Sequence, residues 1–171
     1  MRGLTRLIAA VAASTMASAL TPCIAQAGTV VVHFIKPTEY TDIGRFDNLQ
    51  PDPLAELQRY LVSLGEQVLP PNQALTVNFL DIDLAGTSRP TRNGAANVRV
   101  MKSAGDAPRI TLEYRLEDNG HVIASGKQDL TDLQFLYRYR GSKQEAVYPY
   151  EKRLLAQWFQ STFAQTSAHP Y

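Results

Sequence analysis

The sequence predicts an α+β domain, a two-layer sandwich in which two helices pack on one face of a mainly antiparallel sheet. Several short segments alternate apolar and polar residues, which is the pattern of strands. Two longer segments repeat leucines or aromatic residues at helical spacing. Most of the predicted strands stand together between these two segments, so the expected order is strand, helix, four strands, helix.

The first 27 residues have the composition of an export signal. Arg2 and Arg6 give a positive start, an apolar segment runs from Leu7 to Leu20, and Ala25-Gln26-Ala27 resembles a cleavage site. The apolar segment is shorter than the ~20 residues that span a bilayer. We therefore predict a cleaved signal, a periplasmic location and one mature domain, residues 28–171, without a transmembrane segment.

Cys23 is the only cysteine, and it lies inside the predicted signal. A cysteine near the end of such a signal can become the lipidated first residue of a lipoprotein. Pro22 stands where such sites carry a small residue, so the lipoprotein is the lesser alternative. After cleavage behind Ala27 the chain would have no thiol for a disulfide, a nucleophile or a metal.

Charge and motifs exclude several functions. The chain has 17 Lys and Arg against 16 Asp and Glu, a balance that argues against a nucleic-acid partner. It has no phosphate-binding glycine loop, no zinc-ligand spacing and no nucleophile elbow, so the sequence indicates no cofactor and favours a protein that is not an enzyme.

The first half of the chain predicts a strand, a helix and a second strand. Apart from His33, residues 30–35 are β-branched or aromatic, and Pro37 ends this run. Asp52 and Pro53 suit the N-cap and first position of a helix with a leucine stripe. A right-handed crossover between the two strands would make one parallel pair.

The second strand is predicted from Ala74 to Leu84. Its alternation changes face near Phe79-Leu80, which predicts a β-bulge there or burial of both faces. The segment from Gly86 to Ala96 has the composition of a surface loop. Val98 and Val100 alternate with Arg99 and Met101, which predicts a short strand.

The second half predicts a hairpin and a helix. Asn119-Gly120 is a two-residue turn signal, so RITLEYRL and HVIASGKQDL are expected to pair antiparallel. Pro149 opens the final helix. Nine of the fifteen aromatic residues lie from Phe135 onward, so this part of the chain is expected to dock on the sheet.

Asp81 and Asp83 are the main candidates for chemistry. Two positions apart in a strand, their carboxylates point to one face and could hold a cation or serve a hydrolase. The structural alternative, which the sequence favours, is that one pairs with Arg99 and the other caps the turn at Ala85-Gly86. A buried carboxylate needs such a partner.

Three other acidic residues are interpreted as structural. Asp129 suits a turn acceptor where a strand ends, and Asp132 follows it closely. Glu151 stands in the first turn of the last helix, where its charge complements the helix dipole.

The segment YRYRG alternates aromatic and basic residues, which are Tyr137, Arg138, Tyr139 and Arg140. Such a surface could stack on sugar rings or meet anionic head groups. The favoured alternative is an edge strand with the tyrosines packed inward and the arginines in solvent, where they deter edge-to-edge pairing.

Six segments in order resemble a known family: VVVHFIKPTEYTDIG, LDIDLAG, VRVM, PRITLEYRL, SGKQDLTDLQFL and YEKRLLAQWF. They are similar to the Gram-negative exported proteins grouped as Domain of Unknown Function 3016 (DUF3016). The resemblance extends from Val30 to Phe159. It implies a periplasmic or envelope location and a single domain, and it supplies no catalytic residues.

These observations predict a non-enzymatic binding or accessory module of the cell envelope. It would contact a protein, glycan or lipid partner through an exposed sheet edge or through the loop from Thr87 to Ala96. The alternative is a metal-dependent or carboxylate-based hydrolase that uses Asp81 and Asp83.

Overall fold

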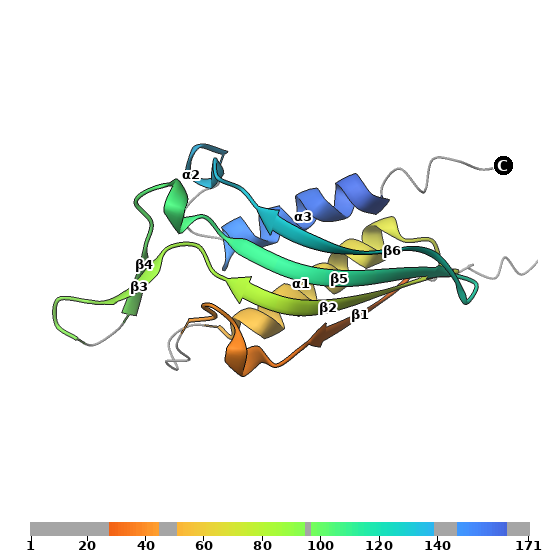
Figure 1. The fold of residues 1–171 in the computed structure, drawn as a ribbon, viewed down its shortest axis with the longest axis horizontal. Coiled ribbons are helices and arrows are strands. Elements are labelled where there is room, and N and C mark those ends of the chain that lie inside the picture. The colour runs from red at the N-terminus through yellow and green to blue at the C-terminus, as the bar shows by residue number, and fades with distance from the viewer. Residues whose placement is uncertain (1–27, 45–50, 95–96, 139–146, 164–171) are drawn as a thin grey trace, which may run out of the picture.

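The computed structural model describes residues 28–44, 51–94, 97–138 and 147–163. The predicted signal lies outside these residues. The main sheet has the order β1-β2-β5-β6, with β1 parallel to β2 and the other neighbours antiparallel. Its strands are β1 (Thr29–Phe34), β2 (Gln73–Asp83), β5 (Arg109–Asp118) and β6 (His121–Thr131). The helices α1 (Pro53–Val68) and α3 (Pro149–Phe163) both lie behind the sheet in Figure 1, which confirms the predicted class.

Helix α1 makes the crossover between the parallel strands β1 and β2. It begins as predicted, because the side chain of Asp52 accepts a hydrogen bond from the Leu54 amide (2.9 Å) and Pro53 is the first helical residue. Gly65 faces β1 so closely that a Cβ there would overlap the side chain of Val30. The helix can therefore lie directly against the strand only because position 65 has no side chain.

The predicted bulge is confirmed in β2, where the pairing register with β5 shifts between Phe79 and Asp81. The hydroxyl of Tyr40 donates to the Phe79 carbonyl at 2.8 Å. Phe79 and Ile82 are both fully buried on the helix side. We call the face of the sheet away from α1 and α3 the open face. Since Asp81 and Asp83 alternate with Ile82, the bulge places both aspartates on this open face.

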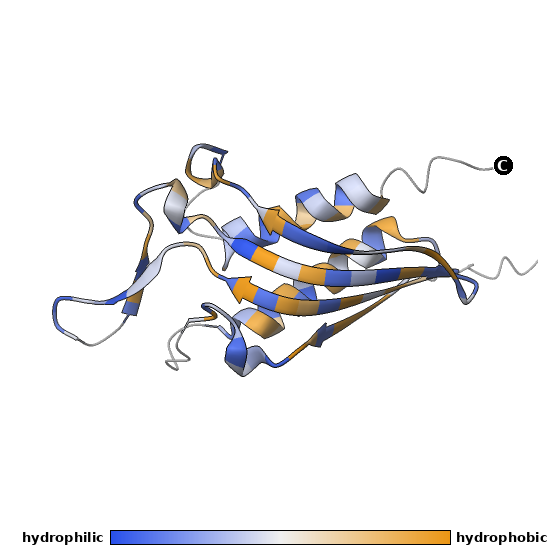
Figure 2. Ribbon diagram, in the orientation of Figure 1, coloured by the Kyte–Doolittle hydropathy of each residue, from blue (hydrophilic) through white to orange (hydrophobic). Residues whose placement is uncertain are grey.

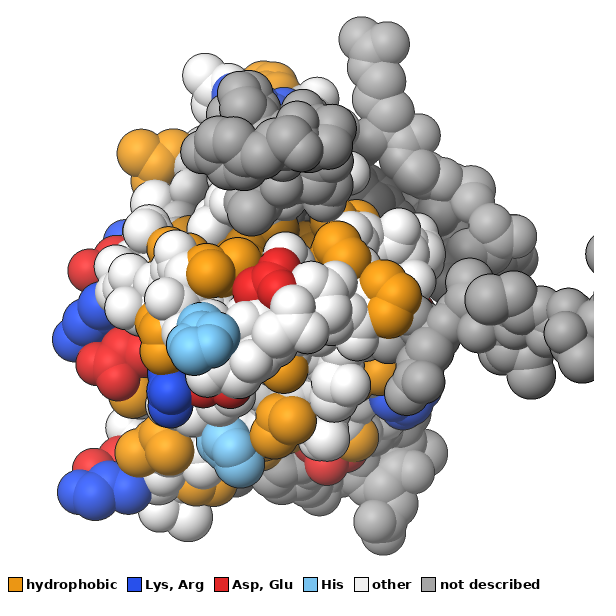
Figure 3. Space-filling view, turned by 90° about the vertical axis from the view of Figure 1, so that its right-hand side faces the viewer, with side chains coloured by type: hydrophobic (Ala, Val, Ile, Leu, Met, Phe, Trp, Pro, Cys, Tyr) orange, Lys and Arg blue, Asp and Glu red, His pale blue; other side chains and the backbone are white. Residues whose placement is uncertain are grey.

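The hairpin of β5 and β6 is also confirmed. Asn119 and Gly120 both have positive φ, 49° and 80°, as a type I′ turn requires. On the open face the strands carry charges of both signs, and Glu113 lies opposite Lys127. Figure 3 shows the hairpin end of the molecule, where the charged side chains gather on the side of this open face. Such a face is typical of an antiparallel sheet that is solvated on one side.

Two details differ from the prediction. Residues expected in a loop form β3 (Thr87–Pro90), which pairs with β4 (Asn97–Val100) in a separate two-stranded sheet. In Figure 1 this ribbon projects beyond the end of the main sheet. We call the described part of the segment, residues 87–94 and 97–102, the arm. The backbone groups of β3 and β4 form hydrogen bonds with each other. This polar segment can therefore adopt an extended conformation although it does not join the main sheet.

The second difference concerns the segment expected as an edge strand. Residues Phe135–Arg138 instead form the short helix α2. The amides of Tyr137 and Arg138 both donate to the Gln134 carbonyl, at 3.0 and 3.1 Å. These local bonds leave no strand at this position for the described residues of YRYRG.

The aromatic residues of α3 dock on the sheet, as expected. Trp158, Phe159 and Phe163 are buried, and their rings lie edge to face at centroid distances of 4.9 to 6.1 Å. Tyr114 of β5 meets Trp158 at 5.8 Å and Phe163 at 5.5 Å. This cluster joins α3 to the centre of the sheet, and Figure 2 shows the hydrophobic residues alternating along the strands. None of the described helices is long and apolar enough to cross a membrane.

Candidate functional site

Asp81 is held by a turn that lies beside the sheet. Its two carboxylate oxygens accept hydrogen bonds from the amide and the hydroxyl of Thr41, each at 2.7 Å. Thr41 follows Tyr40, whose hydroxyl binds the bulge of β2. Asp81 therefore fixes the segment after β1 against the sheet, and this bonding fits the structural interpretation.

Asp83 lies in a small polar hollow of about 190 Å³, where Asp42 and Asp106 also line the wall. Partial burial raises the pKa of the Asp83 carboxyl, the Asp42 carboxylate raises it further, and Arg109 lowers it. Within the described ranges, no group of three or more His, Cys, Asp or Glu side chains is arranged to hold a metal ion. The described carboxylates of the hollow are therefore not arranged as a cation site.

Arg99 binds the turn that follows β2. Its Nε donates to the Ala85 carbonyl at 2.8 Å, and one terminal nitrogen donates to the carbonyls of Leu84 and Gly86, each at 2.7 Å. The same nitrogen forms an ion pair with Asp42 at 2.8 Å. One guanidinium therefore fastens the base of the arm to both the turn and the segment after β1.

This arrangement corrects the partner expected for Arg99. Neither Asp81 nor Asp83 forms an ion pair with it, and Asp42 takes that place. Asp42 also accepts a bond from the Gly44 amide at 2.7 Å. The local signal for such a turn, Asp two residues before Gly, was present in the sequence. Nothing local indicates the pairing across 57 residues.

Glu151 reaches the same turn from α3. Its side chain is only 2% exposed, and it accepts a hydrogen bond from the Ala85 amide at 2.7 Å. Burial raises the pKa of the Glu151 carboxyl. Hydrogen bonds from the backbone amides of Ala85 and Glu151 and the charge of Arg99 lower this pKa by smaller amounts. The expected dipole effect therefore describes only part of its role, since Glu151 also ties α3 to the turn.

We expect Glu151→Gln to stabilise the protein at neutral pH. A raised pKa in the folded state means that folding favours the uncharged carboxyl, and glutamine keeps the acceptor without the charge. The advantage of the variant should shrink as pH falls and should be nearly gone by pH 4.5, the ordinary value for glutamate. Urea unfolding at several pH values measures this.

The control is Glu66→Gln on the exposed side of α1. It should change the free energy of unfolding little at any pH. A Glu151→Gln variant that is less stable at neutral pH would show that the charge of Glu151, attracted by Arg99, outweighs the cost of burial.

Asp129 and Asp132 both accept local hydrogen bonds. Asp129 takes one from the Thr111 hydroxyl of β5 at 2.8 Å. Asp132 is buried and takes one from the Gln134 amide at 3.0 Å, at the start of α2. Asp132 therefore accepts from a backbone amide in a turn, which is the role predicted for Asp129. Asp129 instead accepts from a side chain of the neighbouring strand.

The YRYRG segment is only partly described. Tyr137 is 87% exposed, and Arg138 donates to the Gln134 side chain at 2.7 Å. Tyr139 and Arg140 lie outside the described residues. Of the four residues, the described Tyr137 and Arg138 belong to the helix α2.

A groove of about 450 Å³ runs between β6 and α3. One wall consists of Gln128, Asp129, Leu130 and Thr131, and the other of Leu154, Gln157, Trp158, Ser161 and Thr162. β6 is the last strand of the sheet, and no described strand pairs with its outer side. The backbone donors and acceptors of an unpaired edge therefore lie beside the groove.

One residue of the groove lining has a buried polar group without a partner among the described residues. Trp158 is 4% exposed, and among the described residues its Nε1 has no hydrogen-bond acceptor. Buried indole N–H groups are normally bonded, so such a donor calls for an explanation. The sequence marked Trp158 only as a core aromatic, since the missing acceptor depends on how α3 meets β6.

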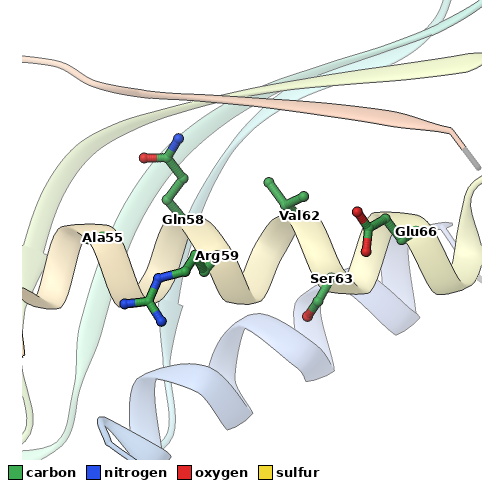
Figure 4. Close-up of a pocket in the computed structure, with 6 residues that line it drawn as sticks. All are labelled: Ala55, Gln58, Arg59, Val62, Ser63 and Glu66. Carbon is green, nitrogen blue, oxygen red and sulfur yellow. The ribbon is translucent and has the colours of Figure 1, made fainter.

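Another hollow, of about 570 Å³, lies on the surface of α1 and is drawn in Figure 4. Its lining comes from this helix alone, and none of the lining residues is buried. Arg59 is already paired with Glu56 at 2.6 Å. This hollow is the outer face of a helix and offers less to a ligand than the groove beside β6.

The fold and the groove together define a two-layer α+β domain with an open sheet edge beside a helix. The chain belongs to the family described as protein of unknown function (DUF3016), whose model matches residues 28–161. This finding confirms the resemblance seen in the sequence. Membership assigns no activity, so function has to be argued from the site.

One solved structure similar to this chain is a minor lipoprotein from Acinetobacter baumannii. The sequences are 17% identical, the TM-score is 0.25, and the match covers 83% of this chain and 93% of that one. A likeness of this degree supports no argument about function. No curated protein matches the chain.

Proposed function

We propose that this protein is a non-enzymatic periplasmic module that binds an extended polypeptide segment along the edge of β6. The observation that carries the proposal is the combination of an 11-residue edge strand, which has no described strand on its outer side, with an adjoining groove. The periplasmic location rests on the predicted export signal.

An extended segment suits this place because it would continue the sheet. Main-chain hydrogen bonds supply affinity in such strand addition, and pockets for alternate side chains supply specificity. In this protein the neighbouring helix α3 would cover the side chains on one face of the added strand.

The lining indicates what kind of segment would fit. Gln128, Gln157, Ser161 and Thr162 are polar and uncharged. Asp129 is the one charged side chain of the lining, and its carboxylate already accepts from Thr111. We therefore infer a segment with small or uncharged side chains. A hydrolase using Asp81 is less well supported, because both oxygens of that carboxylate are bonded to Thr41.

The test uses the fluorescence of Trp158, the single tryptophan of the sequence. Peptides of 11 residues, the length of β6, are selected by display against the purified protein and then titrated. Bound peptides should change the tryptophan emission. Gln157→Arg should weaken this binding by about tenfold or more, because it puts a charge into the groove wall.

The matched control is Gln160→Arg, an exposed position of the same helix outside the groove lining. It should leave peptide affinity within about twofold. Equal loss in both variants, or selected peptides that bind without altering Trp158 emission, would place the binding elsewhere and contradict the proposal.

A further inference from the structure

The arm differs from the rest of the protein in charge. It contains Arg89, Arg92, Arg99 and Lys102, while all 16 acidic residues of the chain lie outside it. A nearly neutral protein therefore has one projecting element with cations alone (Figure 1). The proposed peptide groove makes no use of this element.

The two faces of the arm have different roles. Arg99, opposite Ser88 in the ribbon, turns back to the carbonyls of residues 84–86. Arg89 lies opposite Val98, and the pair therefore belongs to the other face. Arg89 is exposed and Val98 is 43% exposed, so this outer face presents a cation beside an apolar side chain.

A second cation of the arm is also exposed. Arg92 comes two residues after the end of β3. Neither Arg89 nor Arg92 forms an ion pair with another described residue. Their charges are therefore available to an external anion.

The base of the arm is fixed in place. Besides the bonds of Arg99, the Gly86 amide donates to the Asp106 carbonyl at 2.9 Å. Gly86 has φ 79°, and a Cβ there would lie 2.8 Å from the Val100 carbonyl oxygen. The glycine thus allows a tight turn into the arm, and the outer face keeps a defined direction relative to the sheet.

We propose that the outer face of the arm binds an anionic lipid surface. The argument is charge complementarity together with chemistry: cations could meet lipid head groups while Val98, beside Arg89, enters the interface between head groups and acyl chains. A purely ionic ligand would make no use of this apolar side chain. Each basic residue near such a surface strengthens binding by about fivefold, and salt screens the attraction.

The experiment measures co-sedimentation of the purified protein with vesicles of phosphatidylglycerol and phosphatidylethanolamine. The double variant Arg89→Gln/Arg92→Gln should bind these vesicles more than tenfold more weakly. The matched control, Arg59→Gln/Arg115→Gln, removes the same charge from exposed positions on α1 and β5. It should change binding less than threefold, and vesicles of phosphatidylcholine alone should bind none of the proteins.

The proposal is overturned if the protein does not bind the anionic vesicles at low salt, or if both double variants lose binding equally. It is also overturned if Val98→Ser leaves vesicle binding unchanged while polyglutamate binds through Arg89 and Arg92, since that would identify an acidic polypeptide as the partner. Gln157→Arg should retain full vesicle binding. Failure of the groove proposal and failure of this one are therefore distinguishable.

Discussion

Arg99→Met is expected to lower the free energy of unfolding by about 3–4 kcal/mol. The change removes four hydrogen bonds and leaves the carboxylate of Asp42 and the carbonyls of Leu84, Ala85 and Gly86 without this donor. The ion pair is partly buried, with 16% of the Arg99 and 32% of the Asp42 side chain exposed, and removing one partner is costly because the groups it bonded lose their donor. For a domain of this size the melting temperature should fall by roughly 10 °C.

The control is Arg89→Met on the neighbouring strand of the ribbon, an exposed position without an ion pair among the described residues. It should shift the free energy of unfolding by less than about 0.5 kcal/mol. A loss below about 1 kcal/mol in Arg99→Met would contradict the claim that this guanidinium holds the turn after β2.

Phe159→Ala is expected to cost about 3–5 kcal/mol in urea unfolding. Phe159 is fully buried, and its ring meets those of Trp158 at 6.1 Å and Phe163 at 4.9 Å. Truncation leaves a cavity between α3 and the sheet, where the remaining rings can collapse only partly. The midpoint of the urea transition should fall without a large change in slope.

Gln160→Ala provides the comparison, because Gln160 is the next residue of α3 and is exposed. Its free energy of unfolding should remain within about 0.5 kcal/mol of the wild type. Equal effects of the two substitutions would mean that α3 contributes little through its buried face.

The predictable parts of the fold depend on neighbouring residues. Asp52 and Pro53 mark the start of α1, and Asn119-Gly120 marks the hairpin, because caps and tight turns are specified within a few positions. The bulge in β2 was visible because a change of face breaks the alternation of apolar residues. These features follow from local chemistry that a single sequence contains.

The remaining parts depend on contacts between distant residues. The composition of residues 86–96 suits a loop, and only the pairing of Thr87 with Val100 and of its neighbours makes β3 a strand. The sequence predicts Arg99 beside Asp81 or Asp83, yet it binds Asp42, because the segment after β1 pairs in parallel with the end of β2. No local pattern indicates this pairing.

The candidate site shows the same division. The spacing of Asp81 and Asp83 puts both on one face, but their surroundings come from other segments: Thr41 bonds to Asp81, and Asp42 and Asp106 line the hollow of Asp83. Glu151 was assigned to the first turn of α3, and its burial follows from the docking of that turn against Ala85. The groove itself needs both β6 and α3 in position, so sequence indicated only an exposed sheet edge.

Amide hydrogen exchange with and without a selected peptide tests the central claim most directly. An added strand would take up the unpaired backbone groups of β6, so amides within His121–Thr131 should exchange more slowly in the complex. The opposite edge strand, β1, should be unaffected. Protection at β1 or in the arm, with none along β6, would contradict the proposed peptide site.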